Sequence, residues 1–383
     1  MPWLSCCTET VGRKACSPFL TRTALFSKPS FAGTVSHRAP QSPLFIVLFV
    51  DPSHHFPLKS SYNLAMGDAP PPEPAMPSEP INLMRGWPAP ALLPSQLIAK
   101  ASSHALSDPS IFTPGLLYGP DPGYEPAREA IASWLTDFYR PKQAVESSRL
   151  CITGGASQNL GCILDVFTDP GHTRAIWIVA PAYMLAFRIF DDAGFAGRMR
   201  GVPEDEEGVD LPYLRREMKK CEADWTEGST RCKPGREWAK AYKHIIYCVP
   251  TFANPSSRTM SLEHRTELVK IAREFDALIV ADDVYDMLQW PVDYAEGTSL
   301  EPMSRAHLPR LVDLDREVEG AAKDGFGNAV SNGSFSKIVG PGVRVGWCEG
   351  TERFAFGLSQ WYVLRKSSLP SLLGASESMR RRD

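Results

Sequence analysis

The sequence lacks a long apolar run, a strong net charge and paired cysteines. Its longest apolar stretch is Leu44–Val50, whereas a bilayer-spanning helix needs about 20 residues. The net charge is only −3 over 383 residues, which gives no reason to expect a nucleic-acid partner. The nine cysteines are scattered, without a CxxC pair, as is typical of reduced thiols in a cytosolic or organellar interior. We therefore expect no membrane span, no nucleic-acid partner and no metal site.

Acidic residues are nearly absent from the start of the chain, where Glu9 is the only acid before Asp51. Basic and hydroxyl side chains are frequent there, which resembles a mitochondrial transit peptide. An unstructured extension is the alternative, because prolines interrupt any amphipathic helix. A proline-rich linker follows at 69–80. Residues 1–80 are thus predicted to be a disordered extension and linker. The expected location is the cytoplasm, or the mitochondrion if residues 1–40 act as a transit peptide.

The rest of the chain alternates short apolar segments with amphipathic ones. Buried strands are predicted at 150–153, 175–179, 244–249 and 277–281, and helices at 94–106, 125–139, 157–166, 211–221 and 262–275. This alternation predicts an α/β fold with a mainly parallel mixed sheet between helices. We expect an N-terminal arm at 81–110, a large domain at 111–346 and the start of a small C-terminal domain at 347–383. Residues 291–328 are expected to be a long insertion with one acidic helical piece.

Polar residues follow the ends of the predicted strands. These residues are Tyr183, Asn254, Asp282 and Tyr285. Ligands of parallel sheets bind beyond the carboxyl ends of the strands, so these side chains are expected to converge on one crevice. Each has a simpler explanation as a turn, cap or rim residue, and that explanation would have to hold at every strand end at once.

The segment Ser331–Gly346 places one lysine, Lys337, among hydroxyls and glycines, with Arg344 seven residues later. A lysine that forms an imine must lose its proton, so it needs a pocket that disfavours the ammonium. The guanidinium fork of an arginine suits a phosphate, and Ser334 and Ser336 could add hydroxyl donors. A surface loop with an exposed lysine and arginine is the alternative.

A second candidate for anion binding lies upstream. The strand at 150–153 runs into Gly154 and Gly155 and then into a helix that starts near Ala156 and Ser157. Free backbone N–H groups and the helix dipole make such a helix N-terminus an anion site. The spacing matches neither a P-loop nor the dinucleotide-binding fingerprint, and an ordinary strand–helix turn remains the alternative.

Together these groups suit an electron-sink cofactor with a pyridine ring and a phosphate. Asp282 could keep the ring nitrogen protonated, while Tyr285 and Asn254 could reach the phenolate oxygen. Tyr183 could stack on the ring face, and Lys337 could form the imine. The phosphate would then lie between the helix N-terminus and the lysine segment.

In this order the residues resemble the class I/II aminotransferases of pyridoxal phosphate (PLP) fold type I. The chain looks closest to the 2-aminoadipate, kynurenine and aromatic aminotransferases, including the fungal valine–pyruvate-like group. The resemblance runs from about Ile81 to the C-terminus. Its most specific motif is the segment 334–346, supported by Asn254-Pro255 and by Asp282–Tyr285.

The resemblance implies PLP as the cofactor, Lys337 as the Schiff-base lysine and general base, and Asp282 as the partner of the pyridine nitrogen. It also implies that Tyr285 and Asn254 bind the ring oxygen and that Tyr183 stacks on the ring. The residues implied to bind the phosphate are Gly155, Ala156, Ser157, Ser334, Ser336 and Arg344. Gly86 and Asn254 would lie beside the substrate, and Tyr118 would reach the phosphate of the neighbouring subunit across a dimer interface. The implied function is ping-pong transfer of an amino group from an amino acid to a 2-oxo acid such as 2-oxoglutarate, by a homodimer.

The chain departs from the family in two places. The segment between Tyr285 and Lys337 is longer than expected. Only the opening of the small C-terminal domain, which carries the arginine for the substrate carboxylate in the family, is expected at 347–383, so that domain is expected to be largely missing. The alternatives to a transaminase are therefore a truncated, catalytically impaired PLP-binding paralogue, and a fold-type-I lyase or decarboxylase, since the fold does not set the reaction.

Overall fold

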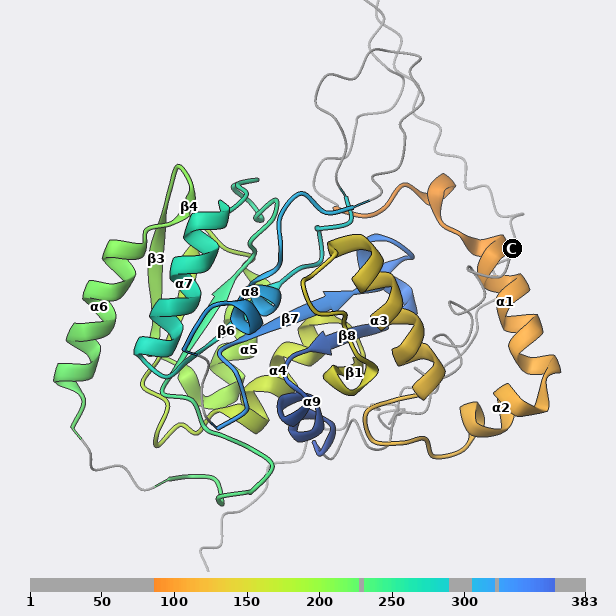
Figure 1. Ribbon diagram of the computed structural model, residues 1–383, viewed down its shortest axis with the longest axis horizontal. Coiled ribbons are helices and arrows are strands. Elements are labelled where there is room, and N and C mark those ends of the chain that lie inside the picture. The colour runs from red at the N-terminus through yellow and green to blue at the C-terminus, as the bar shows by residue number, and fades with distance from the viewer. Residues whose placement is uncertain (1–85, 227–230, 289–304, 321–323, 362–383) are drawn as a thin grey trace, which may run out of the picture. The chain divides into compact units, whose positions relative to one another are not determined.

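The computed structural model describes residues 86–226, 231–288, 305–320 and 324–361. In this part of the chain an eight-stranded sheet runs in the order β1-β8-β7-β6-β5-β2-β3-β4 with helices packed around it (Figure 1). The strands are β1 (Leu150–Thr153), β2 (Ala175–Ala180), β3 (Met199–Asp205), β4 (Gly208–Val209), β5 (His244–Cys248), β6 (Ala277–Asp282), β7 (Ala329–Ser334) and β8 (Gly346–Glu349). The predicted α/β class is confirmed.

The central strands β3, β2, β5, β6 and β7 are parallel. β8 runs antiparallel to both of its neighbours, β1 and β7, and β4 pairs antiparallel with β3 at the edge. The sheet is therefore mainly parallel and mixed, as predicted. Because the parallel strands all end at one edge, the segments that follow them are brought to the same place.

The α-helices are α1 (Ser95–Ser107), α2 (Pro109–Leu116), α3 (Glu125–Tyr139), α4 (Ala156–Phe167), α5 (Leu185–Phe190), α6 (Leu211–Asp224), α7 (Leu262–Glu274), α8 (Leu311–Glu317) and α9 (Glu352–Ser359). A π-helical turn, Asp191–Phe195, continues α5, and 3-10 turns lie at Pro90–Leu92, Ser147–Arg149, Phe335–Lys337 and Pro341–Val343. The predicted helices are present, and the helical piece expected in the insertion corresponds to α8. Strands β3, β4, β7 and β8 and helices α2, α5 and α9 were not predicted.

Alternation along the strands divides the core between the two faces of the sheet. In β6, Leu278 and Val280 pack into the cluster that contains α4 and α5. Ile279 and Ala281 pack into the cluster that contains α6 and α7. Side chains alternate between faces with a period of two, so a strand covered on both faces must be apolar throughout. This explains why the strands read as continuous apolar runs.

The predicted boundary at 347 falls inside the sheet. β8 lies between β1 and β7, and α9 packs on β1 and α4. Residues 347–359 thus belong with the sheet. The small domain expected at 347–383 stays a prediction, since residues 362–383 lie outside the described residues, as do the extension at 1–80 and much of the insertion.

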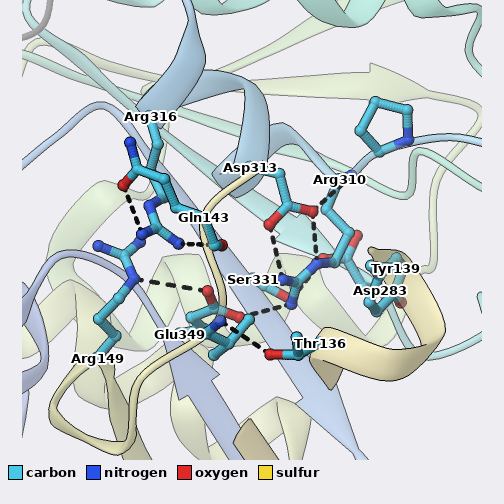
Figure 2. A network of polar contacts seen from close by, with 12 residues as sticks. Thr136, Tyr139, Gln143, Arg149, Asp283, Arg310, Asp313, Arg316, Ser331 and Glu349 are labelled. Carbon is cyan, nitrogen blue, oxygen red and sulfur yellow. Dashed lines mark hydrogen bonds and ion pairs between the residues drawn. The ribbon is translucent and has the colours of Figure 1, made fainter. Parts of the chain in front are cut away.

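A buried ion network ties α3, α8 and β8 together (Figure 2). The fully buried Arg310 donates to both oxygens of Asp313, at 3.0 and 2.8 Å, and to Glu349 Oε2 at 2.6 Å. Its guanidinium lies 4.2 Å from the ring centroid of Tyr139. The other oxygen of Glu349 lies 3.7 Å from Nε of Arg149. The charges of this network, which we call the Arg310 network, compensate one another inside the protein.

No helix in the described part of the chain combines the length and the apolar character needed to cross a membrane. No group of three or more His, Cys, Asp and Glu side chains within that part is placed to hold a metal ion.

Candidate active site

A cavity of about 770 Å³ lies at the carboxyl ends of the parallel strands. It is lined by Gly86, Trp87, Pro88, Ala156, Ser157, Tyr183, Leu185, Val249, Asn254, Asp282, Val284, Tyr285, Leu288, Ser334, Ser336, Lys337, Pro341 and Arg344. The polar members come from segments up to some 250 residues apart in the chain, as the contact between Gly86 and Lys337 shows. The convergence predicted from the strand ends is therefore present.

Asp282 ends β6 and contributes a carboxylate whose two oxygens differ. Oδ2 accepts a hydrogen bond from the hydroxyl of Tyr247 at 2.8 Å, while Oδ1 is buried and has no hydrogen-bond partner. Burial raises the pKa of Asp282 to about 6; the Tyr247 hydrogen bond and the charge of Lys337 oppose the rise, and Asp286 adds to it. Because Asp282 lines the cavity, Oδ1 is an acceptor available to a donor that binds there.

The neighbouring Asp283 does not line the cavity. It is buried, and its Oδ2 accepts a hydrogen bond from Ser331 Oγ on β7 at 2.5 Å. Of these two adjacent acids, Asp282 and not Asp283 lines the cavity. The three-residue spacing from Asp282 to Tyr285 favours the same choice, since both residues line the cavity.

Lys337 ends the 3-10 turn that follows β7 and projects into the same cavity. Its Nζ lies 3.4 Å from the carbonyl oxygen of Gly86 and 5.7 Å from the ring centroid of Tyr285. The turn is held by Ser334, whose Oγ accepts from the backbone N–H of Ser336 at 3.1 Å. A single amine is thus presented beside an aromatic ring and opposite the N-terminal arm.

An anion cradle lies at the start of α4. The first N–H groups of an α-helix have no partner within the helix, and no side chain caps this one at Gly155. Arg344 lies against the same turn, with NH2 2.8 Å from the carbonyl oxygen of Gly154. A Cβ on Gly155, where φ is +97°, would come within 2.8 Å of that guanidinium, so only glycine suits this position. Backbone donors, hydroxyls and a guanidinium can therefore meet one anion here.

Two phenols, Tyr183 and Tyr285, and one amide, Asn254, also line the cavity. Asn254 Nδ2 lies 3.4 Å from the hydroxyl of Tyr285. Burial raises the pKa of Tyr285, which the Asn254 hydrogen bond opposes, and burial together with Asp282 raises the pKa of Tyr183. Both phenols therefore keep their protons at neutral pH and can act as hydrogen-bond donors.

Gly155 and Tyr118 are the predicted site residues that do not line the cavity. Gly155 lies directly behind it, against Arg344. Tyr118 is 85% exposed. Because its predicted role concerns a neighbouring subunit, that role stays a prediction. The other predicted residues all line the cavity.

The apolar lining of the cavity and the residue behind Asp282 were not predicted from the sequence. Trp87, Leu185 and Leu288 line the cavity, but nothing in their local sequence distinguishes them from packing residues. Tyr247 carried a usable signal, because it is a phenol near the end of a strand that is otherwise predicted to be buried and apolar. A buried phenol needs a hydrogen-bond partner, and the end of the neighbouring strand could supply one.

The chain matches the family model "Aminotransferase class I and II" over residues 88–369. It is 37% identical over 287 residues to an uncharacterized protein of Saccharomyces cerevisiae, covering 70% of this chain and 63% of that one. It is 30% identical over 260 residues to a 2-aminoadipate transaminase of Thermus thermophilus, covering 68% of this chain and 52% of that one.

Among solved structures, the multiple substrate aminotransferase of Thermococcus profundus superposes with a TM-score of 0.56 at 25% identity, covering 77% of this chain and 62% of that one. The chain thus spans between about half and two thirds of the length of these relatives. The matched range contains every predicted site residue except Gly86, including the motif around Lys337. The chain belongs to the class I and II aminotransferase family.

Proposed function

We propose that the protein transfers an amino group from an amino acid to a 2-oxo acid with PLP as its cofactor. The observation that carries the proposal is one cavity that brings together a lone amine, Lys337, an unpaired buried carboxylate oxygen on Asp282, and an uncapped helix N-terminus. These are the three anchors that a pyridine aldehyde phosphate requires. Family membership supports the same reaction.

The residues present fit PLP at each of its polar groups. Oδ1 of Asp282 would accept from a protonated pyridine nitrogen, and Asn254 and Tyr285 would donate to the phenolic oxygen. The start of α4 would hold the phosphate together with Arg344. Ser334 and Ser336 add hydroxyl donors beside it, and Tyr183 would lie on the ring face. When bound, PLP supplies an electron sink for the bonds at the α-carbon of the amino acid.

The chain's own residues would then have separate tasks. Lys337 binds the cofactor through Nζ and, once released, moves the proton at the α-carbon as a general base. Asp282 keeps a proton at the ring nitrogen, since an ionised carboxylate beside it favours the cationic form. Gly86 and Asn254 border the place where the substrate would enter.

The finer features of the reaction are part of the proposal. We propose a ping-pong order in which 2-oxoglutarate is the acceptor, because the two substrates would use the same cavity in turn. We also propose a homodimer in which Tyr118 contacts the phosphate site of the neighbouring subunit. Light scattering on a size-exclusion column tests the dimer. A PLP titration of Tyr118→Ala against wild type tests the contribution of that side chain to cofactor affinity.

An absorbance titration tests the function most directly. The purified chain is mixed with PLP and scanned, then treated with a panel of amino acids and finally with 2-oxoglutarate. We expect a visible band that is absent in Lys337→Ala, that amino acids remove and that 2-oxoglutarate restores. Absence of the band contradicts PLP binding. A band that no amino acid changes favours the catalytically impaired paralogue, and release of carbon dioxide favours a decarboxylase.

We further propose that the protein acts in the cytoplasm, with the mitochondrion as the alternative if residues 1–40 act as a transit peptide. The basic, acid-poor start of the chain is the reason for the alternative. Fluorescent fusions with and without residues 1–40 distinguish the two locations.

A further inference from the structure

We propose that Tyr247 is a positioning residue for Asp282: its buried hydroxyl holds one carboxylate oxygen so that the other faces the cavity. The proposal deepens the proposed function, because it rests on the cavity receiving a ring with a cationic nitrogen. It adds a residue that lies outside the cavity lining and acts only through Asp282.

The sheet register places the two side chains on one face. β5 and β6 are parallel neighbours, and Tyr247 pairs with Val280. Both residues pack into the core cluster on the α4 and α5 side of the sheet. Asp282 lies two residues beyond Val280, so strand alternation brings its side chain to the same face. The long phenol can then reach forward along the strands to the carboxylate.

The ring of Tyr247 is held firmly. It is 2% exposed, and the ring of Phe190 on α5 meets it edge-on, with centroids 5.7 Å apart. A buried hydroxyl without a partner is costly, and this hydroxyl donates to Asp282 Oδ2 at 2.8 Å. A donor fixed by packing therefore fixes the rotation of the carboxylate as well.

The asymmetry of the carboxylate follows from this contact. Oδ2 is occupied by the phenol, whereas Oδ1 is buried without a partner. Without the phenol the carboxylate could turn, and neither oxygen would be held toward the cavity. A positioned acceptor binds a donor more tightly because less rotational freedom is lost on binding.

The charges around Asp282 give the contact a second effect. The ionisable groups that face it are Tyr247 on β5, Tyr183 after β2, Asp286 and Tyr285 in the turn after β6, and Lys337 after β7. Burial raises the pKa of Tyr247 well above its usual range, and the charge of Asp282 raises it further, so the phenol stays a donor. Its hydrogen bond opposes the effect of burial on the pKa of Asp282, and removing it should make that carboxyl harder to ionise.

A pair of Tyr→Phe variants separates positioning from packing. Tyr247→Phe removes the hydroxyl and keeps the ring. Tyr242→Phe is the matched control, since Tyr242 is also fully buried in the same cluster and donates its hydroxyl to the carbonyl oxygen of Gly327 at 2.6 Å. If the hydroxyls served only stability, the two variants would behave alike.

The first readout uses cofactor-free protein. Carbon-13 NMR of labelled aspartate side chains, with the Asp282 signal assigned by Asp282→Asn, follows the titration of that carboxyl. We expect the midpoint to rise by about one pH unit in Tyr247→Phe and to stay unchanged in Tyr242→Phe. The second readout is the dissociation constant of PLP, which we expect to rise about tenfold only in Tyr247→Phe.

Equal behaviour of the two variants in both readouts overturns the proposal. If Tyr247→Phe does not fold, 3-fluorotyrosine at position 247 keeps the ring and strengthens the donor, so the midpoint of Asp282 should fall; an unchanged midpoint contradicts the proposal. If the wild-type protein does not bind PLP at all, the proposed function fails. The titration of Asp282 in the cofactor-free protein still decides whether Tyr247 governs the carboxylate.

Discussion

Two buried charge clusters in this protein differ in how their carboxylates are compensated. In the Arg310 network, Asp313 and Glu349 both accept from the guanidinium of Arg310. In the turn after β6, Asp282 and Asp283 are both buried, and each keeps one oxygen without a hydrogen-bond partner. The first cluster pairs its carboxylates with guanidinium groups, whereas the second leaves an acceptor on Asp282, a residue that lines the cavity.

The pKa directions express the same difference. Burial alone would lower the pKa of Arg310, but Asp313 and Glu349 outweigh it and raise that pKa well above its usual range. For Asp282, Asp283 and Asp286, burial raises the pKa, and repulsion by neighbouring acids adds to it at Asp282 and Asp283. Buried carboxyls with a raised pKa, such as Asp282, are typical of functional sites. Paired charges, such as those of the Arg310 network, are typical of a structural role.

The largest effect should come from removing the amine of the cavity. Lys337→Ala is expected to abolish the visible band of bound PLP and to reduce transamination by about three orders of magnitude or more. The unfolding midpoint should hardly change, because the contacts of Nζ are long, 3.4 Å to the carbonyl oxygen of Gly86 and 5.7 Å to the ring centroid of Tyr285. Lys220→Ala, on the exposed face of α6, is the control and should leave both absorbance and activity as they are. A retained band in Lys337→Ala would place the attachment point elsewhere.

Removal of the centre of the Arg310 network should cause the largest loss of stability. Arg310→Ala leaves Asp313 and Glu349 buried without their guanidinium, which costs about 3–5 kcal/mol of unfolding free energy. Arg215→Ala is the matched control, since Arg215 also meets two carboxylates, those of Glu267 and Glu274, but at the surface. Its loss should be about 1 kcal/mol or less. Urea unfolding measures both, and equal losses would contradict the contrast between the two sites.

The pH dependence of the cofactor-free protein tests the second cluster. The folded pKa of Asp282, about 6, lies above the unfolded value of 3.8, so the folded state binds its proton more tightly. Asp282 therefore contributes roughly 3 kcal/mol to the free energy of unfolding below about pH 4, and this contribution is lost as the pH rises through about 6. Asp282→Asn cannot titrate, so its stability relative to wild type should rise over that range.

Urea unfolding between pH 4 and 7 gives this difference. The pKa values of Asp283 and Asp286 are raised as well, so the difference between wild type and Asp282→Asn isolates the contribution of Asp282. The exposed Asp224→Asn is the control and should give curves parallel to wild type. A constant difference between wild type and Asp282→Asn would show that the carboxylate ionises as freely in the folded state as in the unfolded state.

The smallest effect is expected at the edge of the Arg310 network. Arg149 lies 3.7 Å from Glu349 Oε1, and Glu349 keeps Arg310 when Arg149 is lost. Arg149→Met retains an apolar stem, so its cost should be about 1–2 kcal/mol, well below that of Arg310→Ala. Thermal unfolding of the single and double variants measures this, and a cost equal to that of Arg310→Ala would mean that the two guanidinium groups act as one unit.

Much of the site could be predicted because it lies at strand ends. The buried strands are continuous apolar runs, so their limits are visible in the sequence; Asp282 directly follows one predicted run, and Asn254 lies in the turn after another. β3 was missed because its sequence, Met199–Asp205, is neither apolar nor alternating; it forms through pairing with β2. β8 was missed because Gly346–Glu349 reads as the end of the lysine segment and becomes a strand only between β1 and β7.

The sequence by itself determined the α/β alternation, the order of the strand-end residues and the motif around Lys337. These are local properties, set by hydrophobic period and by residue type at a turn. Only the tertiary structure decided that Tyr247 holds one oxygen of Asp282, and that residues 347–359 belong with the sheet. Each of these depends on strand order and register, which join residues that are distant in the chain and leave no local pattern to detect.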